Sequence, residues 1–209
     1  MTKTKFGFLG FLAIAFIAIV LRPPVASLGP LLDEIQSTLG VGSAQISLLA
    51  AAPVFCFGLG AFAGPWLVSR FGVNRAMLYV LVFLALALVL RMFFGYLGLL
   101  LGTVGAGLSI AIANVLLPTV VRMQFPNRVP LVTGAYTTVL AISASVAASV
   151  AVPSSRFLGG FNPALALWIV PVLLAIVLWL PQTINQIKHV PQIASIAAEE
   201  KSALNRSPI

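Results

Sequence analysis

The sequence predicts an all-α membrane protein, folded as a bundle of six transmembrane helices. Its 209 residues are 60% hydrophobic and only 8% charged, whereas a soluble domain is about 45 to 50% apolar and about 25% charged. A single domain in water could not bury so much apolar surface. A bilayer accommodates it, because each spanning helix takes about 20 consecutive apolar residues, and the few charges leave six windows of roughly that length.

Each of the six apolar windows is interpreted as one helix. The predicted helices cover about residues 6–32, 46–68, 74–92, 97–121, 130–152 and 163–180. Together they form one bundle over residues 1–181. The composition then turns polar, so residues 182–209 are expected to form a cytoplasmic linker or tail.

The first predicted helix contains Arg22-Pro23-Pro24 between two uncharged stretches, residues 6–21 and 25–32. Because proline removes a backbone donor and bends a helix, we expect the helix to continue past a kink. A secretory signal peptide is the alternative, since Lys3 and Lys5 precede the apolar stretch and Val25-Ala26-Ser27 resembles a cleavage site. The five spans that follow favour a retained helix.

Close helix packing is expected in the remaining spans. Only Arg91 and Met92 separate the third and fourth windows, so Gly95, Tyr96 and Gly98 mark or flank a tight turn. Small residues at four-residue spacing let membrane helices approach closely. They recur as Gly60 and Gly64 in the second helix, Gly98, Gly102 and Ala106 in the fourth, and Ser143, Ala147 and Ala151 in the fifth.

The net charge of +8 comes from basic residues at the ends of apolar segments, not from one patch. That distribution argues against nucleic-acid binding and fixes orientation by the positive-inside rule. Both termini are predicted to be cytoplasmic in a bacterial-style inner membrane, with Arg22, Arg91 and Arg156 left over. Nine basic residues share the cytoplasmic side: Lys3, Lys5, Arg70, Arg75, Arg122, Arg128, Lys188, Lys201 and Arg206.

No catalytic or metal-binding constellation is evident. Cys56 and His189 are the single representatives of their types, so neither a disulfide nor a metal site is expected, and no cofactor is indicated. No Gly-rich phosphate loop appears. Two function classes stay open at this point: an intramembrane enzyme, and a channel or assembly subunit. The six windows also lack Asp, Glu and His, and Asp33 and Glu34 are expected in the first outer connection. If the chain moves a solute, the lack of a carboxylate that could carry a proton argues weakly for transport without proton coupling.

Arg22 is the most informative candidate residue. A guanidinium inside a spanning segment costs at least about 2.5 to 3.5 kcal/mol unless it faces protein or water. It either faces a central cavity, where its fork of donors attracts an anionic or polar solute, or snorkels to the outer interface. Asn114, one turn before Pro118, and Tyr136, beside two threonines, are further candidates, each equally compatible with hydrogen bonding between helices.

The connection after the second helix reads Pro65-Trp66-Leu67-Val68-Ser69-Arg70-Phe71-Gly72-Val73-Asn74-Arg75 and resembles the signature loop of the major facilitator superfamily. Leu67, Arg70 and Gly72 match that pattern, whereas Pro65 replaces a glycine, Ser69 an acid and Asn74 a basic residue. Two more stretches, Leu21-Arg22-Pro23 with Gly29-Pro30-Leu31-Leu32 and Ala113-Asn114-Val115-Leu116-Leu117-Pro118 with Phe125-Pro126, are similar to the branch of cyanate permeases and nitroimidazole transporters.

The resemblance implies half of a twelve-helix fold that moves a small solute, such as cyanate or a small polar compound, by alternating access. It implies a solute contact at Arg22, beside the candidates Asn114 and Tyr136, and a conformational loop at Arg70, Gly72 and Arg75. The chain holds six helices where that family has twelve. A truncated gene, a separately encoded second half and a homodimer are the open explanations, with a non-transporting subunit or remnant as the alternative function.

Overall fold

The computed structural model describes residues 3–184, and all regular secondary structure in this range is helical. The tail predicted for residues 182–209 therefore lies, beyond Ile184, outside the described residues. Within 3–184, six segments are long and apolar enough to span a membrane, which confirms the predicted fold class. They are Gly10–Leu39, Ser43–Gly60, Val73–Leu90, Gly95–Gln124, Pro126–Leu158 and Phe161–Ile184.

The first span is a chain of short helices. It comprises α1 (Lys3–Leu21), α2 (Pro23–Ala26), the 3-10 turn η1 (Gly29–Leu31) and α3 (Leu32–Leu39). Asp33 and Glu34, expected in an outer connection, instead occupy the first turn of α3, where their charge suits the helix dipole. Gly40 ends the span in the left-handed conformation, with φ of 62°.

Long helices form the next four spans. They are α4 (Ser43–Phe71), α5 (Val73–Leu90), α6 (Gly95–Gln124) and α7 (Val129–Leu158), with the 3-10 turn η2 (Pro126–Arg128) before α7. The sixth span begins with α8 (Phe161–Ala166) and continues as helix over residues 169–184. Several helices reach beyond their apolar windows, α7 as far as Leu158, because polar residues at the window edges still complete helical turns.

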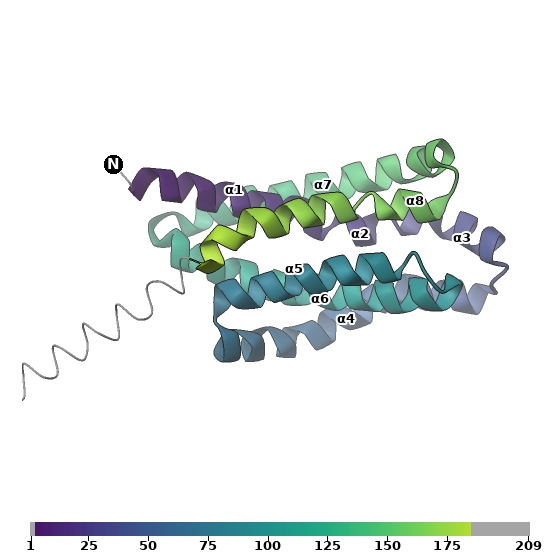
Figure 1. The fold of residues 1–209 in the computed structure, drawn as a ribbon, viewed down its shortest axis with the longest axis horizontal. Coiled ribbons are helices and arrows are strands. Elements are labelled where there is room, and N and C mark those ends of the chain that lie inside the picture. Colours follow the sequence, from purple (N-terminus) through teal and green to yellow (C-terminus); the bar gives the residue numbers. More distant parts are fainter. Residues whose placement is uncertain (1–2, 185–209) are drawn as a thin grey trace, which may run out of the picture.

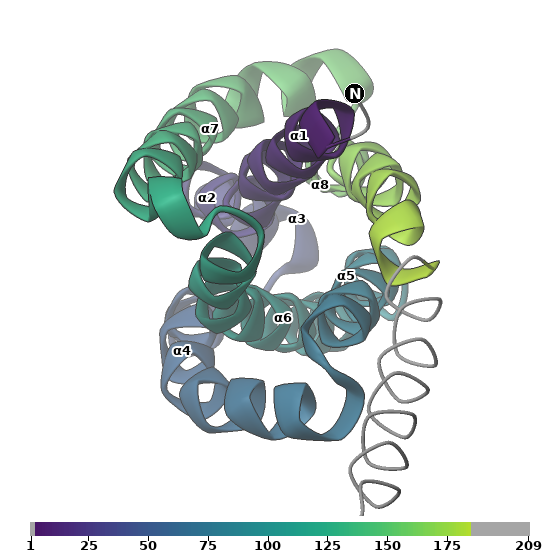
Figure 2. The ribbon, with the colours of Figure 1, turned by 90° about the vertical axis from the view of Figure 1, so that its left-hand side faces the viewer.

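The helices form two layers of three. In the end-on view α6 lies between α4 and α5, and α1 lies between α7 and the last helix (Figure 2). The short α2 contacts α7 and α6. Successive helices run antiparallel, so the N-terminus and the α4–α5 and α6–α7 connections share one end of the bundle, while α3 and the α5–α6 and α7–α8 connections share the other (Figure 1).

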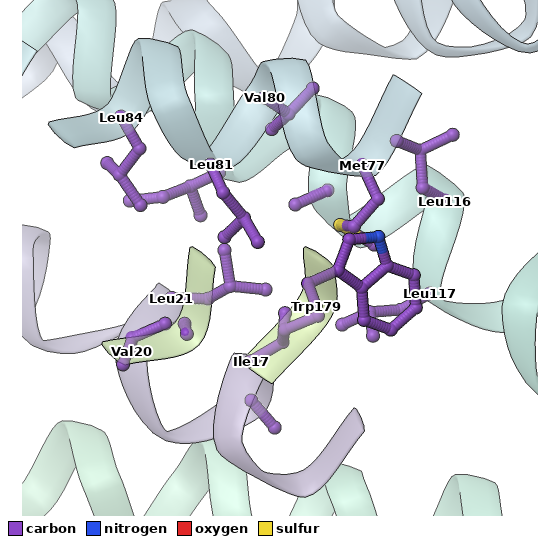
Figure 3. Close-up of a cluster of buried hydrophobic side chains, with 14 of the residues drawn as sticks. Ile17, Val20, Leu21, Met77, Val80, Leu81, Leu84, Leu116, Leu117 and Trp179 are labelled. Carbon is purple, nitrogen blue, oxygen red and sulfur yellow. The ribbon is translucent and has the colours of Figure 1, made fainter. Parts of the chain in front are cut away.

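A continuous hydrophobic cluster joins the layers. Ile17 and Leu21 of α1 meet Leu81 of α5 and Leu117 of α6, and Trp179 of the last helix lies among them (Figure 3). The Trp179 indole is fully buried and its Nε1 donates to the backbone oxygen of Asn74 at 2.9 Å. Burial of this one side chain therefore fastens the sixth span to the start of α5.

The predicted small-residue contacts hold α6 in place. A Cβ atom added at Gly60 would lie 2.3 Å from the Ala111 Cβ, and one at Gly64 would lie 2.9 Å from Val115. On its other side α6 places Gly98 and Gly102 against backbone oxygens of residues 87–93. Such distances leave no room for a methyl group, so these glycines set the spacing of α4, α6 and α5.

Candidate functional site

Arg22 lies at the break in the first span. It is exposed and directly precedes α2, between the buried residues Leu21 and Pro23. Its carbonyl accepts from the N–H groups of Val25 and Ala26, at 3.2 and 2.9 Å, so its backbone belongs to the first turn of α2. No ion pair is formed by its guanidinium with the side chains that the structure describes.

The place of Arg22 along the first span follows from the elements around it. Asp33 comes 11 residues later and lies in the first turn of α3. The segment α2 lies well inside the length of the bundle, away from both ends (Figure 1). Because the first span continues to Leu39, Arg22 does not lie near the end of the span at α3, which weakens the snorkelling alternative.

Asn114 and Tyr136 lie on the two helices that α2 contacts. Asn114 is half-buried in α6, and its amide takes part in no hydrogen bond recorded among the described residues. Tyr136 of α7 is 7% exposed and packs into the main hydrophobic cluster. The structure thus brings together the helices of the three predicted solute contacts, while no recorded hydrogen bond joins their side chains.

The threonines beside Tyr136 face outward with satisfied hydroxyls. Thr137 donates to the carbonyl of Thr133 at 2.9 Å, and Thr138 to that of Gly134 at 2.9 Å. Serines farther along α7 bond to their own helix in the same way. This polar stripe on α7 is consequently stable in an apolar setting without a partner.

The predicted conformational loop is a connection of one residue. Gly72 ends α4 and starts α5 with φ of 77°, donates to the Val68 carbonyl and accepts from Ala76, both at 2.9 Å. Glycine adopts that φ without the steric cost of a Cβ atom. Arg70 and Arg75 are exposed on either side of it, so the two charges flank this turn at the end of the bundle.

Arg91 is a charged residue whose importance the sequence did not reveal. Expected as an outer-connection charge, it directly follows α5 and is only 3% exposed. Its Nη1 donates to the Pro24 oxygen at 2.7 Å, across 67 residues of sequence. Two features of the sequence point to it: a lone cation between two apolar windows, and the pair Gly98 and Gly102 in the helix that follows. Arg156, expected in a loop, is exposed in the last turn of α7.

The described Cys and Glu side chains form contacts between helices. Among the side chains that the structure describes, no three His, Cys, Asp or Glu residues lie close enough together to hold a metal ion. The buried Cys56 thiol instead donates to the Val104 carbonyl at 3.4 Å, within the α4–α6 contact. Glu34, the half-buried acid, accepts from the Ser155 hydroxyl at 2.6 Å and so joins α3 to α7.

Comparison with known proteins finds transporters. No family model matches the chain. It is 34% identical over 170 residues to the uncharacterized transporter YycB of Bacillus subtilis (strain 168), covering 81% of this chain and 42% of that protein. It is 32% identical over 196 residues to the 2-nitroimidazole transporter of Escherichia coli (strain K12), covering 94% and 49%. It is 28% identical over 169 residues to the cyanate transport protein CynX of the same strain, covering 80% and 44%.

Six membrane-spanning segments together with these relatives define the class: the chain is a multi-pass membrane protein and a homologue of transporters. More narrowly, it resembles one half of a major facilitator superfamily protein of the cyanate and nitroimidazole branch. The chain spans less than half the length of the curated relatives that it matches.

Proposed function

We propose that this chain transports a small solute by alternating access, as one six-helix half of a major facilitator-type transporter. The solute is a small anion such as cyanate, or a small polar compound, and Arg22 contacts it near the middle of the membrane. The observation that carries this proposal is the exposed guanidinium at the break of the first span.

The electrostatics of the break favour a polar solute over a lipid contact. An arginine at this depth costs about 2.5 to 3.5 kcal/mol or more unless it meets water, protein or an anion. Pro23 and Pro24 lack N–H groups, so the carbonyls of Ile19 and Val20 lose their usual helical donors. A cation beside such a break gives a solute both donors and acceptors, and Asn114 and Tyr136 on the adjoining helices complete the proposed contact set.

Completion of the transport unit requires a second half. Only 22% of the apolar window of α7 is buried, against 61% of that of α6. Aromatic side chains on α4 are likewise open, including Phe62, 84% exposed. We assign these faces of α4 and α7 to packing against another six-helix bundle, either a second copy of this chain or a separately encoded half, in addition to lipid. A parallel dimer about the membrane normal has the symmetry for this.

The location follows from the same proposal. The connections that carry Arg70, Arg75, Arg122 and Arg128 share one end with the N-terminus (Figure 1), and the positive-inside rule makes that end cytoplasmic. The protein is then an inner-membrane protein with cytoplasmic termini. Arg70, Gly72 and Arg75 form the cytoplasmic loop that the moving halves rearrange.

Uptake into liposomes tests the proposal. We predict that the purified chain takes up labelled cyanate or 2-nitroimidazole saturably, and that Arg22→Ala lowers the initial rate by about ten-fold or more, the scale of one charge-assisted hydrogen bond. Arg156→Ala is the matched control, because it removes an exposed arginine from the outer end of α7. It should leave the rate unchanged.

Comparison of the two variants decides whether Arg22 has a special role in transport. Equal losses in Arg22→Ala and Arg156→Ala would remove the special role of Arg22. A chain that reconstitutes correctly but shows no saturable uptake of either compound would contradict transport of these solutes by this chain alone.

A further inference from the structure

The buried guanidinium of Arg91 has fewer hydrogen-bond partners than donor groups. Its side chain is buried at the outer end of α5, yet only Nη1 has a hydrogen-bond partner, while Nε and Nη2 are buried without one. A hydrophobic side chain of similar volume would avoid the cost of burying this charge. The one bond that Arg91 does form, to the Pro24 carbonyl, is therefore the feature of this cation to explain.

The Pro24 carbonyl is free because the first span is broken there. The backbone N–H and the hydroxyl of Ser27 both donate to Pro23, at 3.0 and 2.8 Å, and the N–H of Leu28 donates to Val25 at 3.2 Å. The local hydrogen bonds thus skip Pro24. A buried carbonyl without a donor is costly in an apolar environment, and the guanidinium of Arg91 supplies the missing donor from another helix.

A glycine of α6 leaves the space through which the Arg91 side chain reaches Pro24. A Cβ atom at Gly102 would lie 2.6 Å from the Arg91 Cγ and 2.5 Å from the Ala87 oxygen. The absence of a side chain at Gly102 therefore lets the stem of Arg91 lie against α6. The cation also sits at the carboxyl end of α5, where the helix dipole stabilises positive charge.

The hydrogen bond from Arg91 to the Pro24 carbonyl, which we call the tether, ends two residues from Arg22. The Arg22 carbonyl bonds into the first turn of α2, and Pro23 and Pro24 are buried and conformationally fixed. Holding the Pro24 carbonyl consequently fixes the turn that begins at Arg22. We propose that Arg91 is a positioning residue that, through the Pro24 carbonyl, sets the direction in which Arg22 presents its side chain. A role in solute handling rests on the proposed function, whereas the tether itself does not.

A cysteine at position 22 reports this geometry without any transport. In a Cys56→Ala, Arg22→Cys background, the reaction rate of the introduced cysteine with a cationic methanethiosulfonate reagent is measured in proteoliposomes. We expect Arg91→Met to change that rate by about five-fold or more, the scale set by one net hydrogen bond. Arg91→Lys keeps a donor for Pro24 and should stay within about two-fold of the parent. Arg156→Met, which removes an exposed outer arginine, should have no effect.

A second pair of variants covers the case in which Arg91→Met fails to fold. Gly102→Ala displaces the Arg91 stem, whereas Gly105→Ala adds a methyl group to the same interface, 3.0 Å from the Ala87 Cβ and away from Arg91. Only Gly102→Ala should alter the rate at position 22. Unchanged rates in folded Arg91→Met, or equal rates in the two glycine variants, would overturn the proposal.

A separate measurement follows solute transport in protein that keeps its native Arg22. Arg91→Met should raise KM by about five-fold or more with a smaller effect on kcat, because it misplaces a solute contact, and Arg91→Lys should restore KM. If the unmodified chain takes up no solute, the proposed function fails, while the rates at position 22 still decide whether the tether exists. A loss of kcat with unchanged KM would contradict the positioning role.

Discussion

Arg22 in the first span and Arg91 directly after the third show that the role of a charged side chain depends on what surrounds it. Arg22 is exposed at the break of the first span, and Arg91 is buried beside the same break. The sequence distinguishes them poorly, since each is a lone cation among apolar residues. What separates them is the acceptor: a helix break leaves the Pro24 carbonyl open, and only Arg91 reaches it.

Trp179 provides a second test at the scale of one residue. We predict that Trp179→Phe lowers the free energy of unfolding by about 1 to 3 kcal/mol, because the bond from the indole to the Asn74 oxygen is lost while an aromatic ring remains. Unfolding in mixed detergent and dodecyl sulfate micelles measures it. Trp168→Phe is the control, since Trp168 is half-buried and no hydrogen bond of its indole is recorded in the described structure. Equal effects of the two changes would contradict the assigned hydrogen bond.

At the scale of elements, close contacts between glycines and small residues hold α6 between its neighbours. Hydrogen bonds at both ends add to them. At the end of the bundle that holds α3, the Tyr96 hydroxyl donates to the Gln45 carbonyl at 2.8 Å, joining α6 to α4. At the other end the Asn74 and Gln124 amides both donate to Gln182 of the last helix. These lateral bonds join the second, third, fourth and sixth spans to one another.

The α4–α6 contact yields a matched pair of substitutions. Gly60→Ala should destabilise the bundle by about 1 to 3 kcal/mol, because the new methyl group meets Ala111 and the helices must separate. Gly58→Ala, on the same helix with nothing within 4 Å of the added atom, should be neutral or stabilising by up to about 1 kcal/mol through helix propensity. The same unfolding assay compares them. A Gly60→Ala protein as stable as Gly58→Ala would show that α4 and α6 do not pack this closely.

At the scale of the whole molecule, the connections divide cleanly between the two ends. Arg128 precedes α7 at one end and Arg156 closes it at the other. In a Cys56→Ala background, an Arg156→Cys protein should react with a membrane-impermeant maleimide on intact cells. An Arg128→Cys protein should react only after permeabilisation, because the positive-inside rule places that end in the cytoplasm. The opposite pattern would reverse the proposed orientation.

The sequence by itself determined the fold class, the number of spans and the close-packing glycines. Each depends on local composition and on helical spacing, which the chain carries independently of its neighbours. It also indicated Arg22, because a cation in an apolar window is visible without a structure. Short motifs carried the resemblance to transporters, and the relatives match over 80–94% of the chain.

Only the tertiary structure decided what surrounds each candidate. It placed Tyr136 in the main hydrophobic cluster, left the Asn114 amide half-buried, and buried Arg91 against Pro24. Burial and hydrogen-bond partners depend on which helices meet and at what rotation, and contacts across 67 residues leave no local pattern in the sequence. Composition therefore fixes the solvent in which the chain folds, whereas helix packing fixes which of its few polar groups are buried and which remain exposed.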